Sequence, residues 1–117
     1  MRTLLAAALA MVSSAAMATE VEDAHRQALA GRDAYWNCLA QQYTRDGNKA
    51  MSGEEFTSLI ANACPSERQN FRVTLVDYLS MQFPDANGGD HMTTANKAIA
   101  LAQEDIVTAF VKRSARR

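Results

Sequence analysis

Side chains that usually carry chemistry are scarce in this sequence. It has two histidines and two cysteines in 117 residues, and a lone histidine is usually a surface or capping residue rather than a metal ligand. No G-x-S-x-G motif, no H-x-x-x-H pair and no phosphate-binding glycine loop is present. The sequence therefore indicates no catalytic residue and no cofactor, and we expect a protein that is not an enzyme.

A strong charge of either sign is missing as well. The chain has 12 basic and 13 acidic residues, whereas a nucleic-acid surface is usually strongly basic, so we expect no nucleic-acid partner. Alternating polar and apolar residues, which indicate strands, do not occur, and neither do internal repeats or low-complexity linkers. These absences favour a single all-α domain.

Only one long apolar run exists, and it lies at the N-terminus. Arg2 precedes an apolar core over residues 4–12, and residues 16–18 (AMA) match the A-x-A site at which signal peptides are cleaved. The core has about half of the roughly 20 residues needed to span a bilayer. We therefore interpret residues 1–18 as a signal peptide and residues 19–117 as a single mature helical domain, periplasmic or secreted, without a transmembrane segment.

Helical periodicity accounts for most of the mature chain. It predicts a first helix over residues 20–43, a second that begins at the capping box of residues 52–55, a third that ends near residue 82 and a last helix after the glycine-rich loop 83–90. Pro65 falls between the second and third helices, where it can kink one long helix or separate two. We expect an all-α bundle of three to four helices.

The starts of the last two helices have several candidate caps. After Pro65, the sequence Ser66-x-x-Gln69 offers a capping box that would restart the helix. For the last helix, the N-cap candidates are Asp90, Thr93 and Thr94.

The two cysteines, Cys38 and Cys64, lie on the apolar stripes of neighbouring predicted helices. In an oxidising compartment they allow one intramolecular pair. Closing this loop should stabilise the fold by about 3–4 kcal/mol on the chain-entropy model. Redox catalysis usually needs a close C-x-x-C pair instead, so we predict a structural disulfide between Cys38 and Cys64.

The first predicted helix also carries a glycine and several aromatic residues. Gly31 lies near its middle, where glycine costs about 1 kcal/mol relative to alanine. Tyr35, Trp36 and Tyr43 form an aromatic side. We expect this side to pack in the core and cover the disulfide, with an exposed partner-binding patch as the alternative.

Residues 44–56, TRDGNKAMSGEEF, resemble the calcium-binding loop of an EF-hand. In this resemblance Asp46 takes the third loop position, Asn48 the fifth, Ser52 the ninth and Glu55 the bidentate twelfth. The resemblance covers one helix–loop–helix and implies a calcium site formed by these four residues.

Two positions depart from the EF-hand pattern. The first loop residue is Thr44 instead of an aspartate, and the sixth is Lys49 instead of the glycine that makes the sharp turn. The simpler interpretation needs no metal: Gly47 and Asn48 end one helix, and the capping box of residues 52–55 begins the next. We therefore expect no metal site and keep the calcium site as the alternative.

A looser resemblance covers the whole mature chain. A signal peptide is followed by Tyr35-x-x-Cys38, by Cys64, by an acidic–basic pair with Phe71, and by a final amphipathic helix. This layout is similar to that of small exported helical proteins with two cysteines, common in proteobacteria, most of which have no assigned activity. The resemblance implies a fold and a compartment, and no chemistry.

These observations predict a non-enzymatic binding or structural accessory protein, periplasmic or secreted, with another protein as its partner. The alternative function is a calcium-responsive module that uses the loop over residues 44–55. The sequence leaves the oligomeric state open.

Overall fold

The chain is helical over nearly its whole length. The computed structural model describes the backbone of residues 2–116 and the side chains of residues 17–116. Its elements are α1 (Arg2–Thr44), the 3-10 helix η1 (Asp46–Asn48), α2 (Gly53–Asn62), α3 (Pro65–Gln82) and α4 (Gly88–Ala115). No strand occurs in this described part, so the expected all-α bundle of three to four helices is confirmed.

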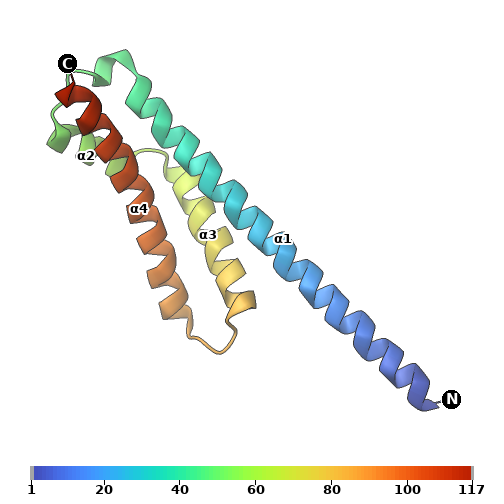
Figure 1. Ribbon diagram of the computed structural model, residues 1–117. Coiled ribbons are helices and arrows are strands. Elements are labelled where there is room, and N and C mark those ends of the chain that lie inside the picture. Colours follow the sequence, from blue (N-terminus) through green and yellow to red (C-terminus); the bar gives the residue numbers. More distant parts are fainter. Residues whose placement is uncertain (1, 117) are drawn as a thin grey trace.

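Three long helices form the body of the molecule (Figure 1). The chain runs back along α1 in α3 and returns in α4, and the short α2 lies at the end of the bundle where α1 finishes. The N-terminal part of α1 extends past the loop between α3 and α4. The molecule is therefore elongated, with extents of 76 × 24 × 23 Å.

The expected signal peptide falls on this N-terminal part of α1. The backbone is helical from Arg2, the Met17 side chain is largely exposed, and Ala24 is the first buried side chain among those described. Within the described range, no helix is both long enough and apolar enough to cross a membrane. Cleavage after residue 18 stays a prediction.

α1 and α3 form the most extensive helix pair, and small side chains on α1 allow their close approach. Ala24, Ala28 and Gly31 follow one another at spacings of four and three residues and are all buried. A Cβ atom on Gly31 would lie 2.8 Å from Thr74 Oγ1 and 3.2 Å from the Cα of Phe71, which is too close for an unstrained contact. The glycine that costs helix propensity is therefore needed for packing.

The main core cluster lies where α1, α2 and α4 meet. The largest completely buried side chains come from α1 and α2, and they are Tyr35, Leu39, Phe56 and Ile60. α4 completes this core: the rings of Phe56 and Phe110 stack with centroids 3.9 Å apart. The buried hydroxyl of Tyr35 accepts a hydrogen bond of 2.9 Å from Gln103 Nε2, so its polar atom is satisfied.

Pro65 separates two helices and does not kink one. Cys64 lies between α2 and α3 with φ 55° and ψ 50°, in the left-handed region, and Pro65 is the first residue of α3. Proline fits there because the first turn of a helix needs no backbone N–H donor. Ser66 lies inside α3, so it does not cap the helix; the N-cap position belongs to Cys64. The end of α3 at Gln82 agrees with the prediction.

α4 begins earlier than predicted. Its N-cap is Asn87, and not Asp90, Thr93 or Thr94. The Asn87 side chain accepts a hydrogen bond of 2.9 Å from the backbone N–H of Asp90. Glycines 88–89 form the first turn, and their low helix propensity conceals this start in the sequence.

His91 is buried in the first turn of α4, with 5% of its surface exposed. Its Nε2 lies 3.1 Å from the carbonyl oxygen of Phe83, the C-cap residue of α3. Of the two positions that the sequence suggested for a lone histidine, surface or capping, the buried His91 does not have the first. Its contact with the C-cap residue of α3 fits the second and joins the start of α4 to the end of α3.

Candidate functional site

The turn between α1 and α2 contains the four residues of the EF-hand resemblance. Asp46 begins η1, its side chain is 93% exposed, and its carboxylate lies 2.7 Å from the Lys49 ammonium. The Lys49 hydrogen bond, and then its charge, hold the pKa of the Asp46 carboxyl below its usual value. The lysine at the glycine position of the EF-hand pattern therefore pairs with one of the candidate calcium ligands.

The other three candidates make contacts within the turn and the helix ends. Asn48 Nδ2 donates a hydrogen bond of 2.9 Å to the carbonyl oxygen of Gln42, near the end of α1. Ser52 Oγ accepts from the backbone N–H of Glu55 at 3.1 Å, and the Glu55 carboxylate accepts from the Ser52 N–H at 3.4 Å. The predicted capping box is thus confirmed. The calcium site stays a prediction.

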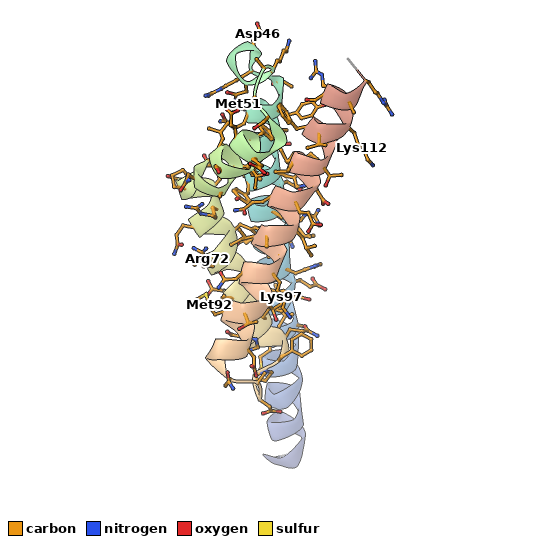
Figure 2. The ribbon with its side chains drawn as sticks, turned by 90° about the vertical axis from the view of Figure 1, so that its left-hand side faces the viewer. Asp46, Met51, Arg72, Met92, Lys97 and Lys112 are labelled. Atoms are coloured by element: carbon orange, nitrogen blue, oxygen red, sulfur yellow. A yellow bond between two sulfur atoms is a disulfide. The ribbon has the colours of Figure 1, made fainter. Side chains whose placement is uncertain are left out.

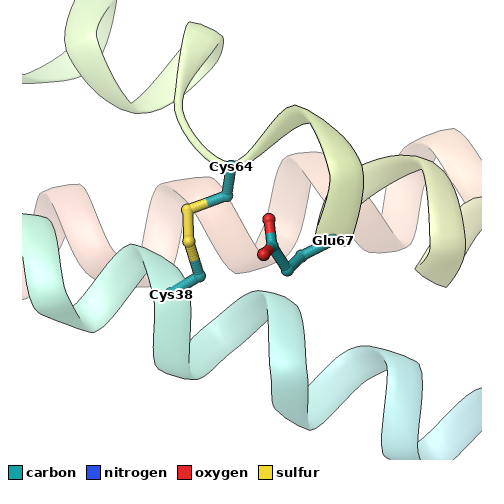
Figure 3. A group of neighbouring side chains, drawn as sticks. All are labelled: Cys38, Cys64 and Glu67. Carbon is teal, nitrogen blue, oxygen red and sulfur yellow. A yellow bond between two sulfur atoms is a disulfide. The ribbon is translucent and has the colours of Figure 1, made fainter.

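The predicted disulfide between Cys38 and Cys64 is present. Its S–S distance is 1.98 Å, and the two Cα atoms are 6.2 Å apart. The bond joins the C-terminal half of α1 to the junction between α2 and α3 (Figure 3). It therefore fixes the end of α2 relative to α1.

Glu67 lies beside this disulfide, although no motif in the sequence indicates a role for it. One of its carboxylate oxygens and the two sulfur atoms all lie within 4.8 Å of one another (Figure 3). Among the described residues, this is the only place where three His, Cys, Asp or Glu side chains gather as metal ligands do. Because the two cysteines are bonded to each other, they have no thiolates to offer. The available signal was the position of Glu67, three residues after Cys64 at the start of a helix.

A groove lies beside α2, at the end of the molecule where Asp46, Met51 and Lys112 are labelled (Figure 2). We call it the α2 groove; its volume is about 690 Å³. It is lined by Gln42, Met51, Glu55, Ser58, Leu59, Asn62 and Ala63. The lining combines three half-buried apolar side chains with four polar ones.

The three residues on the aromatic side of α1 are buried to different degrees. Tyr35 is completely buried and Tyr43 is half-buried, but Trp36 keeps 39% of its surface exposed. The core interpretation is therefore confirmed for Tyr35, whereas Trp36 projects toward solvent.

Comparison with known proteins adds no relative to this description. No family model, no curated protein and no solved structure matches the chain. The likeness to small exported two-cysteine proteins and the likeness to an EF-hand loop therefore stay predictions, and the geometry alone carries the functional argument.

Proposed function

We propose that the protein is an exported, non-enzymatic accessory protein that binds another protein through the α2 groove. The observation that carries this proposal is a shallow groove that contains apolar side chains and lies beside α2, whose end the disulfide fixes. Met51 and Leu59 are half-buried within it. A partner that covers their remaining surface would gain about 25 cal/mol for each Å² of apolar area removed from water.

Both ends of α2 are fixed, so the wall of the groove is preformed. The capping box of Ser52 and Glu55 holds the first turn, and the Cys38–Cys64 bond holds the chain just after the last turn. In addition, the Arg68 guanidinium donates to the carbonyl oxygen of Ala61 near the end of α2. A preformed wall reduces the entropy that a partner must lose on binding.

The charges at the groove indicate the chemistry of the partner. Glu54 and Glu55 both lie in the first turn of α2, and Glu55 lines the groove itself. Opposite charge steers association and suppresses the wrong partners. The partner segment that fits has an apolar side chain for the contact with Met51 and Leu59, with a lysine or arginine beside it.

Site-specific photo-crosslinking tests this function. A photoreactive amino acid at Ser58, on the groove, should form a covalent adduct with one protein in intact cells. The same group at Thr108, an exposed position on α4, serves as the matched control and should form none. Leu59→Asp should abolish the adduct at position 58. Equal labelling at the two positions under all growth conditions would contradict the proposal.

Export is tested separately, by the mass and N-terminal sequence of the protein recovered from outside the cytoplasm. The expected N-terminus is Thr19. A cytoplasmic protein that keeps its first 18 residues would contradict the assignment of the compartment while leaving the groove interaction open to the crosslinking test.

A further inference from the structure

Cys64 has a position that normally makes a cysteine reactive. It is the N-cap residue of α3, and although its side chain makes no capping hydrogen bond, its sulfur lies near the positive end of the helix dipole, where a thiolate is stabilised. A stabilised thiolate is a good leaving group in thiol–disulfide exchange. On this basis alone, the Cys38–Cys64 bond would be easy to reduce.

Glu67 places a negative charge at the same point. It belongs to the first turn of α3, and a carboxylate oxygen lies within 4.8 Å of each sulfur atom. The residue is half-buried, so water screens its charge only in part. Its carboxylate therefore offsets the helix dipole and opposes the formation of a thiolate on either cysteine.

We propose that Glu67 is an electrostatic guard that keeps the disulfide closed in the presence of reducing thiols. It does so by raising the free energy of the thiolate that must leave, and by repelling the thiolate that must approach. The disulfide then persists although one of its sulfur atoms lies at a helix N-terminus. This function is independent of the partner proposed for the α2 groove.

The reaction that Glu67 opposes begins at Cys38, which is the more exposed of the two cysteines; Cys64 is only 7% exposed. A thiolate of a dithiol reductant attacks Cys38 Sγ and forms a mixed disulfide. The Cys38–Cys64 bond breaks, and its electron pair leaves on Cys64 Sγ. The second thiol of the reductant loses its proton and displaces Cys38 as a thiolate, so that the reductant becomes a cyclic disulfide and the protein gains two protons from water.

The test compares the rates at which the folded, oxidised protein and its variants are reduced. Glu67→Gln keeps the size of the side chain and removes its charge, and we expect reduction by dithiothreitol to become about three- to tenfold faster. An uncharged phosphine should also reduce this variant faster, by a smaller factor, because it senses the leaving thiolate but is not repelled. Raising the salt concentration should bring the wild-type rate toward that of the variant.

Two further variants separate charge from structure. Glu54→Gln removes the same charge from the first turn of α2 and should leave the rate of reduction unchanged. Glu67→Asp keeps a carboxylate near the sulfur atoms and should restore most of the protection.

Two results would overturn the proposal. One is a Glu67→Gln rate equal to the wild-type rate with both reductants. The other is a Glu67→Asp variant that is reduced as fast as Glu67→Gln, because the side-chain packing, and not the charge, would then protect the bond. The thermal midpoint of each oxidised variant shows whether any change in rate comes from a less stable fold.

Discussion

Gly31 is the residue at which a missing side chain matters most. The Cβ of an alanine there would meet Thr74 Oγ1 at 2.8 Å and the backbone of α3 at Phe71. The rotatable threonine can give way, but the backbone can do so only if the two helices move apart. The contact between α1 and α3 therefore depends on glycine at this position.

We predict that Gly31→Ala lowers the free energy of unfolding by about 1–3 kcal/mol, as overpacking does elsewhere. The loss should outweigh the roughly 1 kcal/mol that alanine gains in helix propensity. Urea unfolding measures the effect. Adding Thr74→Ala to the variant should recover part of the loss, since it removes the nearest atom. A Gly31→Ala protein more stable than the wild type would refute this account of the helix contact.

Asp46 gives a prediction about a single ionisation. Because Lys49 holds the pKa of its carboxyl below 3.8, the ion pair is present above that pH and is lost as the pH falls through the folded-state pKa. Lys49→Met should raise the Asp46 pKa toward 3.8, and an NMR titration of the side-chain carboxyl measures it. Lys112→Met serves as the control and should leave the pKa unchanged. An unchanged pKa in Lys49→Met would show that the pair does not form in solution.

Some residue contacts can be predicted from the sequence and others cannot. The disulfide could be predicted because two cysteines allow one pairing. Glu67 and His91 could not be assigned from the sequence. Glu67 meets a sulfur atom of α1, far away along the chain. His91 meets a carbonyl oxygen only eight residues earlier, at the end of α3, and this contact depends on how the loop between α3 and α4 turns the chain back.

At the scale of the element, the residues of the turn before α2 have two interpretations: a calcium-binding loop, or a helix end followed by a capping box. Ser52 and Glu55 bond to each other's backbone N–H groups, and Asp46 pairs with Lys49. A calcium ion would have to replace these contacts in order to bind.

We therefore predict that millimolar calcium leaves the thermal midpoint and the Trp36 fluorescence unchanged. Circular dichroism and fluorescence titrations measure both quantities. Glu55→Gln is the control variant, since it removes the residue at the bidentate position. A calcium-dependent rise in the midpoint of the wild type that is lost in Glu55→Gln would establish the EF-hand alternative.

The helix boundaries show which local sequence patterns predict where a helix begins or ends. The capping box of α2 is correct because it depends on the backbone of adjacent residues alone. The break at Pro65 was ambiguous because the apolar periodicity continues through it. The left-handed conformation of Cys64 is unusual for a residue other than glycine, and no property of a cysteine predicts it from sequence.

At the scale of the whole molecule, the disulfide holds three helices at one junction. It connects α1 directly to the start of α3 and so fixes the position of α2 between them. The chain has a modest core, concentrated at this end of the bundle. A covalent bond there should supply a large part of the total stability.

Replacing both cysteines by serine should lower the free energy of unfolding by about 3–4 kcal/mol. Urea unfolding of the variant and of the reduced wild type should give similar losses. Thiol labelling of the unreduced, denatured wild type should detect no free thiol. A double variant as stable as the oxidised protein would mean that the bond constrains the unfolded chain less than its loop length implies.

The bundle itself follows from helical periodicity, but the arrangement of its helices does not. The apolar stripes indicate that each helix packs against another helix, but they do not determine which one. The close contact of α1 with α3 depends on the fit of Gly31 against the backbone of α3 at Phe71, and that fit becomes visible only when both helices are placed.

The closed loop between Cys38 and Cys64 also has a mechanical consequence. When tension is applied to the two ends of the oxidised chain, the force passes through the sulfur bridge across 6.2 Å between Cα atoms. The 25 residues inside the loop bear no load, and roughly 85 Å of contour length cannot be released. η1 and α2 lie wholly inside that loop. The wall of the groove that α2 forms is therefore shielded from stretching as long as the bridge remains intact.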